Sequence, residues 1–284
     1  MNSFNSDHLP PLRQVIHDLN LLAKKSLGQN FLLDMNITRK IARLANLPPL
    51  ADVIEIGPGP GGLTRALLEN PIHTLTAVEL DDRIIPYLQQ LQNIDTRLHI
   101  IHQNAVGLDV VAKTPYATPQ SRAIVANLPY QVASPLLLGW LKQTAHFHSF
   151  TLMFQEEVAE RLVASPSSKA YGRLSVMTQW LCEADIVLRL PPSAFTPPPS
   201  INSAVIRLKP RILPSPSPSF ATMEKLVAAA FSQRRKMLRG SLKLLLKTPE
   251  IWLEKAEILP TARAEELNVQ QYCRLAILLE KMYL

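Results

Sequence analysis

Residues 53–68, VIEIGPGPGGLTRALL, decide the predicted fold of this 284-residue chain. The first four residues, one of them acidic, read as a buried parallel strand because they are otherwise apolar and β-branched. A glycine-rich turn follows directly, and helix-forming residues come after it. Gly57, Gly59 and Gly62 would let the backbone of this turn approach a ligand closely. Strand, glycine-rich turn and helix in this order predict an α/β, Rossmann-like fold that binds a nucleotide.

An acidic residue follows the next strand, where a nucleotide-binding fold needs one. The strand is predicted over residues 75–78, and Glu79 comes directly after it. A carboxylate at that place can bind the ribose hydroxyls of a nucleotide. The glycine spacing also fits a dehydrogenase, which therefore stays an alternative. Glu55, inside the first strand, favours S-adenosylmethionine, because a carboxylate there can orient the glycine turn or meet the ammonium group of that cofactor.

The predicted chemistry lies in a second turn, Ala126-Asn127-Leu128-Pro129-Tyr130, which follows the short apolar run 123–125. The side chain of Asn127 offers a carbonyl that can accept a hydrogen bond from an amine. Pro129 stiffens the turn and leaves main-chain carbonyls pointing outward. Tyr130 supplies a ring on which a flat heterocycle can stack. Acceptors beside an aromatic ring suit the exocyclic amine of a nucleobase.

Two further segments contribute candidate residues. The strand predicted over residues 98–102 leads into Gln103-Asn104-Ala105, where a polar side chain could read the adenine edge of the cofactor. Phe195, in a proline-rich loop, is either a hydrophobic plug or a second stacking surface opposite Tyr130. The remaining predicted elements are helices over 37–45, 156–163 and through 177–181, a helix from near Ser134, and strands over 149–154, 185–190 and 204–208.

A change of composition divides the chain. Residues 212–219 read as a Pro/Ser linker, so we expect a Rossmann-like domain over 1–211, with a lid segment at 1–33, and a helical domain over 220–284. The helical domain carries a run of cations without an acid, which favours contact with phosphate groups. Its apolar residues Leu238, Leu242 and Leu245 share one helix face, so the cations can lie on another. The candidate RNA-binding residues are Arg234, Arg235, Lys236, Arg239 and Lys243.

The composition favours a polyanionic partner and argues against several other classes of protein. The net charge is +7 and the isoelectric point is about 9.5, which favours a polyanionic partner. Cys182 and Cys273 stand apart from each other and from any Cys/His cluster, so we expect reduced thiols and no metal site. The uncharged span 123–141 contains Asn, Gln and Pro, so we expect no transmembrane segment. We therefore expect a cytoplasmic protein.

Seven segments in order resemble the KsgA family, the ribosomal small-subunit RNA adenine N6,N6-dimethyltransferases. They are KSLGQNFL (25–32), EIGPG (55–59), VELD (78–81), NLPY (127–130), YGRLSVM (171–177), SAFTPPP (193–199) and QRRKMLRGSL (233–242). The resemblance covers residues 24–280. It implies transfer of methyl groups from S-adenosylmethionine to N6 of two adjacent adenosines in the 3′-terminal hairpin of 16S ribosomal RNA. The expected partner is the small ribosomal subunit, and the expected state is a monomer without metal.

The resemblance also implies residue roles. The cofactor would contact Gln29, Asn30, Leu32, Glu55, Gly57, Gly59, Glu79, Leu80, Asn104, Ala105 and Asn127. The target adenine would be held by Asn127, Leu128, Pro129, Tyr130 and Phe195. Asn104 departs from the family, which usually has aspartate there, so we expect a weaker hydrogen bond to the cofactor adenine.

Other functions remain open on the same fold. A non-catalytic ribosome-assembly factor would keep the basic domain but would not need Asn127, Tyr130 and an intact glycine turn. A large-subunit RNA dimethyltransferase shares a similar Asn/Pro/Tyr turn, but the segments 193–199 and 233–242 point away from it. A DNA adenine methyltransferase more often has two prolines after the Asn or Asp. A dehydrogenase would leave Tyr130 and the basic helical domain unexplained.

Overall fold

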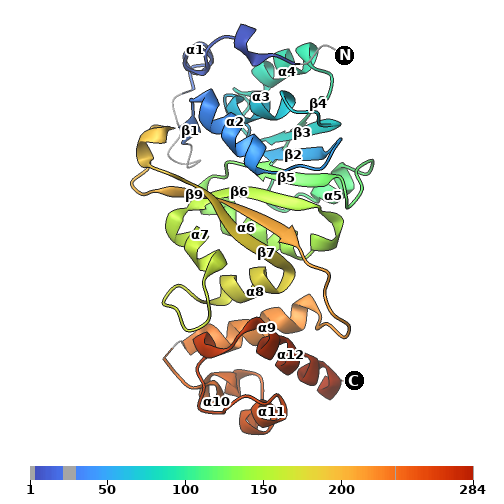
Figure 1. The fold of residues 1–284 in the computed structure, drawn as a ribbon, viewed down its shortest axis with the longest axis vertical. Coiled ribbons are helices and arrows are strands. Elements are labelled where there is room, and N and C mark those ends of the chain that lie inside the picture. Colours follow the sequence, from blue (N-terminus) through green and yellow to red (C-terminus); the bar gives the residue numbers. More distant parts are fainter. Residues whose placement is uncertain (1–3, 22–29, 234, 284) are drawn as a thin grey trace. The chain divides into compact units, whose positions relative to one another are not determined.

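The computed structural model describes residues 4–21, 30–233 and 235–283 of the chain (Figure 1). The predicted lid positions from 22 to 29, including Gln29, and the cation Arg234 lie outside the described residues. The chain forms two compact units. Unit 1 comprises Met1–Ala159 and Asp185–Pro210, and unit 2 comprises Glu160–Ala184 and Arg211–Leu284.

Among the described residues, a seven-stranded sheet has the order β4-β3-β2-β5-β6-β9-β7. Strands β2 to β6 pair in parallel, and β9 pairs antiparallel with β6. The bounds are β2 Asp52–Ile56, β3 Thr74–Glu79, β4 Leu98–His102, β5 Arg122–Ala126, β6 Ser149–Gln155, β7 Cys182–Leu190 and β9 Ser203–Pro210. The chain runs outward from β2 to β4 and then returns to the other side of β2. In such a sheet the ligand crevice lies where the direction reverses, at the carboxyl ends of β2 and β5.

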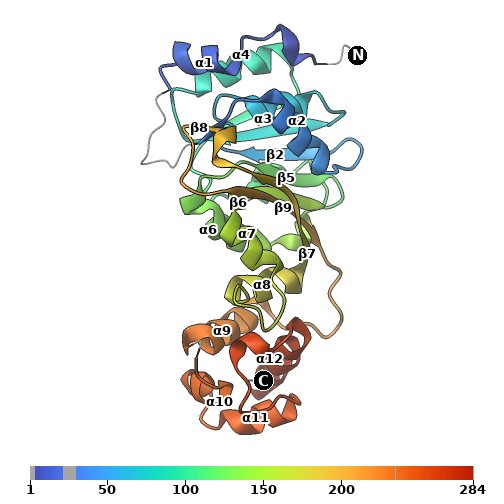
Figure 2. The same cartoon turned by 60° about the vertical axis from the view of Figure 1, so that its left-hand side comes forward.

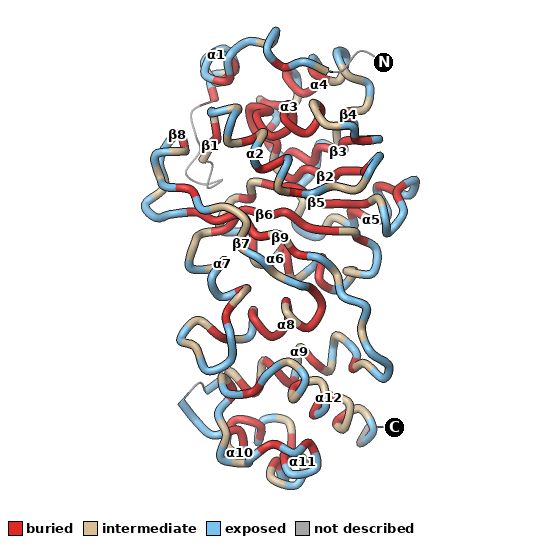
Figure 3. The backbone as a smooth tube through the Cα atoms, in the orientation of Figure 1, coloured by how far each residue is buried: buried red, intermediate tan, exposed pale blue. Residues whose placement is uncertain are grey.

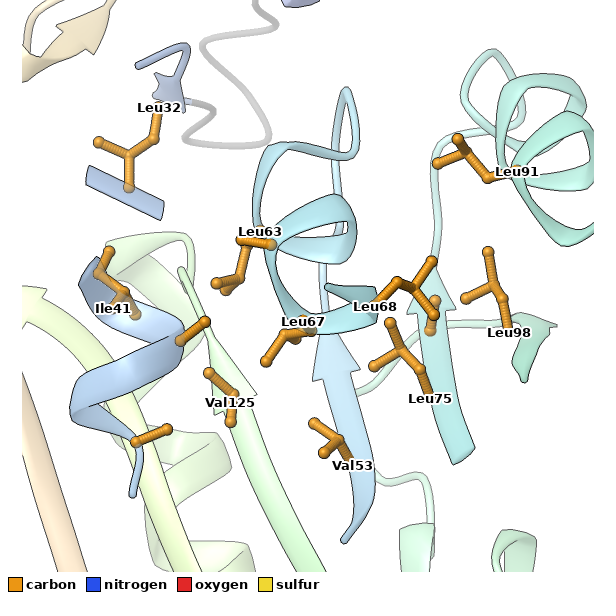
Figure 4. Close-up of a cluster of buried hydrophobic side chains, with 14 of the residues drawn as sticks. Leu32, Ile41, Val53, Leu63, Leu67, Leu68, Leu75, Leu91, Leu98 and Val125 are labelled. Atoms are coloured by element: carbon orange, nitrogen blue, oxygen red, sulfur yellow. The ribbon is translucent and has the colours of Figure 1, made fainter. Parts of the chain in front are cut away.

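The helices of unit 1 cover the sheet and bury its apolar residues. Every residue of β2 and of β5 is buried, as a central strand covered on both faces requires (Figure 3). Figure 4 shows Leu67 of α3 lying toward Val125 of β5, and Leu68 lying toward Leu75 of β3. The helices are α1 Leu12–Asp18, α2 Met35–Leu44, α3 Gly62–Leu68, α4 Ile85–Ile94, α5 Val110–Lys113, α6 Tyr130–Leu141 and α7 Glu156–Val163, the last of which continues into unit 2.

Unit 2 is mainly helical where it is described, and it also includes the first residues of β7. Its core contains the buried rings of Tyr171 and Tyr272, each of which lies near Phe231, and the Tyr171 hydroxyl donates to the carbonyl of Leu267 at 2.9 Å. Its helices are α8 Arg173–Leu181, α9 Phe220–Ala230, α10 Leu238–Ser241, α11 Pro249–Lys255 and α12 Val269–Tyr283.

The mixed α/β, Rossmann-like fold class is confirmed, and the two units differ in extent from the predicted domains. Residues 160–184, which the sequence assigns to the first domain, belong to unit 2. The physical reason is the apolar face of α8, where Trp180 is 4% exposed and its ring lies 6.1 Å from that of Phe220 in α9. The Pro/Ser run 212–219 therefore lies inside unit 2 and not between the units.

Two local predictions were wrong. Helix α6 begins at Tyr130 and not near Ser134, because the carbonyl of Pro129 accepts from the amides of Val132 and Ala133 at 3.1 and 3.2 Å. Pro135 lies inside this helix and does not start it. The segment that carries Leu238, Leu242 and Leu245 is not one α-helix, because α10 ends at Ser241 and a 3-10 helix spans Leu242–Leu244. The Leu238 amide, at the start of α10, donates to the Ala262 carbonyl at 2.8 Å.

Candidate functional site

A cavity of about 230 Å³ opens at the carboxyl ends of β2, β3, β4 and β5. The predicted site residues that line it come from five segments of unit 1. They are Asn30, Leu32, Glu55, Gly57, Gly59, Glu79, Leu80, Asn104, Ala105, Asn127, Leu128, Pro129 and Tyr130. The fold thus joins the predicted cofactor residues and the predicted adenine-binding turn in one cavity.

The glycine turn has the backbone conformation that its sequence demands. Gly57 and Gly59 have φ angles of +67° and +55°, a region that side chains disfavour. A Cβ on Gly59 would lie 3.2 Å from the ring of Phe31, whereas one on Gly57 would meet nothing within 4 Å. Glycine is therefore required for the shape of this turn at both positions.

Glu79 ties the glycine turn to the end of β3. Its carboxylate accepts hydrogen bonds from the amides of Gly59 at 3.2 Å, Leu80 at 2.7 Å and Asp81 at 2.8 Å. Burial raises the pKa of Glu79, and the three amides oppose that effect because they stabilise the carboxylate. The side chain lines the cavity, so it stands where a carboxylate can also accept from ribose hydroxyls.

Glu55 is a buried acid beneath the cavity. It is 1% exposed, and its Oε2 accepts a hydrogen bond from the Thr64 hydroxyl of α3 at 2.7 Å. Burial is the main cause that raises the pKa of Glu55 to about 8, with a smaller contribution from the charge of Glu79. Glu55 therefore carries its proton at neutral pH, and it connects β2 to the helix that follows the glycine turn.

Asn104 lies at the rim of the cavity beyond β4. The side chain is exposed, and its Oδ1 accepts from the Val106 amide at 2.9 Å. Leu80 and Val106 line the same cavity and are each 49% exposed, which is high for such apolar side chains. The sequence analysis did not identify Val106 as a site residue. The signal was its position two residues after Asn104, where its amide can donate to the Asn104 side chain.

The Asn-Leu-Pro-Tyr turn presents a fixed amide and a fixed phenol. Nδ2 of Asn127 donates to the main-chain carbonyl of Asn30 at 3.3 Å, so Oδ1 is the acceptor end of that amide. The Tyr130 hydroxyl and Oγ of Ser203 lie 2.5 Å apart, and burial raises the pKa of Tyr130. Ser203, on β9, was not predicted from the sequence; it holds the phenol at one end and leaves the ring as a cavity wall.

Phe195 does not line this cavity. It is 3% exposed and belongs to the apolar core of unit 1. It lies in β8 (Phe195–Thr196), which pairs with β1 (Phe31–Leu32) so that Phe195 stands opposite Leu32. The structure therefore places Phe195 beside Leu32 in a two-stranded sheet and in the apolar core, which fits the hydrophobic plug and not the second stacking surface.

The predicted RNA-binding cations that the structure describes are all on the surface of unit 2. Arg235, Lys236, Arg239 and Lys243 are exposed, while Leu238 and Leu242 between them are buried. Among the described residues, no group of His, Cys, Asp and Glu could hold a metal ion. None of the described helices is both long and apolar enough to cross a membrane.

The residues that line the cavity are chemically compatible with S-adenosylmethionine. The glycines leave the turn without side chains where a ligand would approach, and Glu79 supplies acceptors next to that turn. Leu80 and Val106 offer exposed apolar contacts for a flat base. The Asn127 turn borders the same cavity, so a group transferred from the cofactor would have a short path to a base held there.

Comparisons with known proteins agree with these observations. A family model described as ribosomal RNA adenine dimethylase matches residues 20–281. Two proteins named ribosomal RNA small subunit methyltransferase A are close relatives. The one from Paracoccus denitrificans is 52% identical over 276 residues, covering 95% of this chain and 96% of its own. The one from Gluconobacter oxydans is 51% identical over 270 residues, covering 94% of this chain and 87% of its own.

The fold also matches solved structures. A crystal structure of a dimethyladenosine transferase from Plasmodium falciparum superposes with a TM-score of 0.71 at 23% identity. The match covers 88% of this chain and 98% of that one.

Proposed function

The chain belongs to the ribosomal RNA adenine dimethylase family, and on that premise we propose that it dimethylates two adjacent adenosines in the 3′-terminal hairpin of 16S ribosomal RNA. S-adenosylmethionine is the methyl donor and N6 is the acceptor atom. The observation that carries the proposal is the single cavity in which the glycine turn and Glu79 meet the Asn127 turn. The modification belongs to small-subunit biogenesis in the cytoplasm, with the enzyme acting as a monomer.

We assign the cofactor to the side of the cavity formed by β2, β3 and β4. Glu79 accepts from the ribose hydroxyls, and Leu80, Asn104 and Ala105 surround the adenine. The glycine turn, Asn30, Leu32 and Glu55 line the other part of the cavity and would hold the methionine part. When bound, the cofactor supplies an electrophilic methyl group on its sulfonium sulfur.

The Asn127 turn activates the adenine amine that accepts the methyl group. The lone pair of an adenine N6 is delocalised into the ring, so the amine is a poor nucleophile. Acceptors at Asn127 Oδ1 and the Leu128 carbonyl draw the N–H bonds out of the ring plane and free the lone pair. Stacking on Tyr130, whose hydroxyl contacts Ser203, holds the base at near-attack distance, about 3–3.5 Å from the methyl carbon.

With the cofactor bound, its sulfonium group would supply the methyl group to N6 and leave as a neutral thioether, and N6 would then release a proton to water. A side-chain base is unnecessary because the alkylated amine is strongly acidic. A second round requires the same acceptors to hold an amine that already carries one methyl group. The target must be unstacked to enter the cavity, so an accessible hairpin loop is the expected substrate.

The helical part of the chain supplies affinity for the RNA. We assign phosphate contacts to Arg235, Lys236, Arg239 and Lys243, which are exposed, and to Arg234. Such contacts are independent of base sequence and weaken as salt is added. This arrangement separates the binding of the subunit in unit 2 from the chemistry in unit 1.

The test uses small ribosomal subunits that lack these methyl groups, incubated with the protein and labelled S-adenosylmethionine. Large subunits are incubated in parallel. Nucleoside analysis is expected to give N6,N6-dimethyladenosine in the 3′-terminal hairpin of the small-subunit RNA alone. Label in the large-subunit RNA would favour the alternative dimethyltransferase. Tight binding of small subunits without label would favour a non-catalytic assembly factor.

A further inference from the structure

Residues 5–21 form a segment that crosses one end of unit 1, as Figures 1 and 2 show, and we call it the N-terminal strap. Helices α3 and α4 lie at this end of the unit. This N-terminal strap lies almost entirely before residue 20, where the match to the family model begins. Leu12, Val15 and Leu21 are 3%, 4% and 2% exposed, so the strap is packed and not merely adjacent. Because three large apolar side chains of this short segment are buried, the hydrophobic effect stabilises its packing on the rest of unit 1.

The first contact of the strap is at the carboxyl end of α3. Arg39 of α2 donates to the carboxylate of Asp7 at 2.7 Å and to that of Glu69, the C-cap residue of α3, at 2.8 and 2.9 Å. The Ser6 hydroxyl also donates to Glu69. The strap, α2 and the end of α3 thus share one network of charged hydrogen bonds.

The second contact is in the middle of α3. Arg65 is 2% exposed, and its Nη1 donates to the main-chain carbonyl of Pro10 at 2.8 Å. Its Nε donates to the Tyr87 hydroxyl of α4 at 3.0 Å. A buried guanidinium needs such acceptors, so the strap carbonyl helps to hold Arg65 in place. Tyr87 in turn packs on the glycine turn, because a Cβ on Gly61 would lie 3.1 Å from its ring.

The third contact is at the amino end of α3, directly after the glycine turn. A Cβ on Gly62 would lie 2.9 Å from Cδ1 of Leu12 and 3.0 Å from the carbonyl oxygen of Leu32. Leu12 therefore rests against the backbone of Gly62, a residue that lines the cavity. The strap reaches α3 at both ends and in its middle.

Helix α3 needs this support. It has seven residues, begins after Gly61 at a φ of +84°, and has no side-chain hydrogen bond at its N-cap. A helix this short is marginal by itself and depends on tertiary packing. Its first residues continue the turn whose glycines form the cavity, so the position of α3 sets the shape of the turn.

We propose that the N-terminal strap is a positioning element of the cofactor site, in which Leu12 and Val15 hold α3 and the glycine turn in the conformation that binds the cofactor. The inference rests on the proposed function of that cavity. Loosening the strap weakens cofactor binding and leaves RNA binding by unit 2 intact. Because such coupling is reciprocal, cofactor binding stabilises the strap.

The first test measures binding of S-adenosylhomocysteine to the full chain by calorimetry, well below the unfolding temperature of each variant. Leu12→Ala and Val15→Ala are expected to weaken binding by about tenfold, and Leu12→Met to stay within about twofold because it keeps the volume. Leu253→Ala is the matched control, since Leu253 is equally buried but lies in unit 2. That variant is expected to leave the cofactor affinity unchanged.

Kinetics separate positioning from a general loss of structure. In Leu12→Ala the KM for S-adenosylmethionine rises, while kcat and the KM for small subunits stay at their wild-type values. A second measurement uses the wild-type chain, so that it is independent of whether a variant folds. Saturation with S-adenosylhomocysteine is expected to slow hydrogen exchange about tenfold at the amides of Val15 and Leu19, which are bonded within the strap.

Unchanged affinity in Leu12→Ala and Val15→Ala would overturn the proposal, as would equal weakening in Leu253→Ala. Unchanged exchange in the strap on saturation would also overturn it. Failure of the wild-type chain to bind S-adenosylhomocysteine would instead contradict the proposed function. The two failures are therefore distinguishable.

Discussion

Replacement of Glu55 by glutamine should change how the stability of unit 1 depends on pH. Glu55 is buried in β2, and burial raises its pKa from an ordinary value of 4.5 to about 8. Between these values the unfolded chain loses the proton while the folded chain keeps it. The unfolded state then binds fewer protons, so stability falls as pH rises, until both states are ionised above about pH 8.

The magnitude follows from the width of that window. Each pH unit between about 5 and 7.5 costs the wild-type protein about 1.4 kcal/mol through this one group. Over the two units from pH 5.5 to 7.5 the loss is about 3 kcal/mol, which is large beside a typical stability of about 5–15 kcal/mol. Glutamine cannot ionise, and its carbonyl can still accept from Thr64. The variant should therefore lack this slope while other titrating groups contribute equally to both proteins.

The assay is urea unfolding at several pH values. It is made in a background in which the other two tryptophans are replaced by phenylalanine, so that Trp140 is the only tryptophan. Because Trp140 lies in α6 of unit 1, its fluorescence reports on the unit that contains Glu55. Glu254→Gln, at an exposed position, controls for the loss of one carboxylate. The free energy of unfolding of Glu55→Gln minus that of the wild type should rise by about 3 kcal/mol from pH 5.5 to 7.5. A difference that stays constant across this range would refute the reasoning.

Three further predictions concern the cavity and the thiols. Asn104→Asp is expected to tighten binding of S-adenosylhomocysteine about fivefold, because a charged acceptor strengthens the bond to the adenine amine; calorimetry showing no tightening would contradict this. Gly59→Ala is expected to weaken the same binding by about tenfold or more, since φ is +55° and a Cβ would press on the ring of Phe31; wild-type affinity would refute the role of that turn. Burial raises the pKa of Cys182 to about 12 and that of Cys273 to about 11, so at pH 8 a thiol reagent should label both thiols much more slowly in the native than in the unfolded protein. Rapid labelling of the native protein would show that these sites are open.

The central strands of the sheet could be predicted from the sequence because burial on both faces leaves a simple pattern. The strand predicted over 98–102 has those same bounds, and β2 is one residue longer than the run 53–56. The cavity could be predicted for a related reason. Parallel strands bring their carboxyl ends to one edge, so Glu79 and Asn127 had to lie near the glycine turn.

What the sequence could not predict depends on contacts between distant segments. Phe195 had two readings, and only its pairing opposite Leu32 places it in the core. Ser203 carries no local signal, since its role comes from the 2.5 Å contact with Tyr130 across 73 residues. The start of α6 was predicted wrongly because proline is common at the first position of a helix, which suggested a start near Pro135. In the structure Pro135 lies inside the helix, after its first turn.

The most direct test of the account compares Asn127→Ala with the wild type in single-turnover methylation of unmethylated small subunits. The enzyme is saturated with both S-adenosylmethionine and subunits, so that only the chemical step is measured. The account predicts that subunit binding stays at its wild-type level, because the cations of unit 2 provide it. The rate of methyl transfer to N6 should fall by about 100-fold or more, as for the loss of a group that stabilises charge in the transition state. A variant that transfers methyl groups at the wild-type rate would show that the Asn127 turn is not where the chemistry occurs.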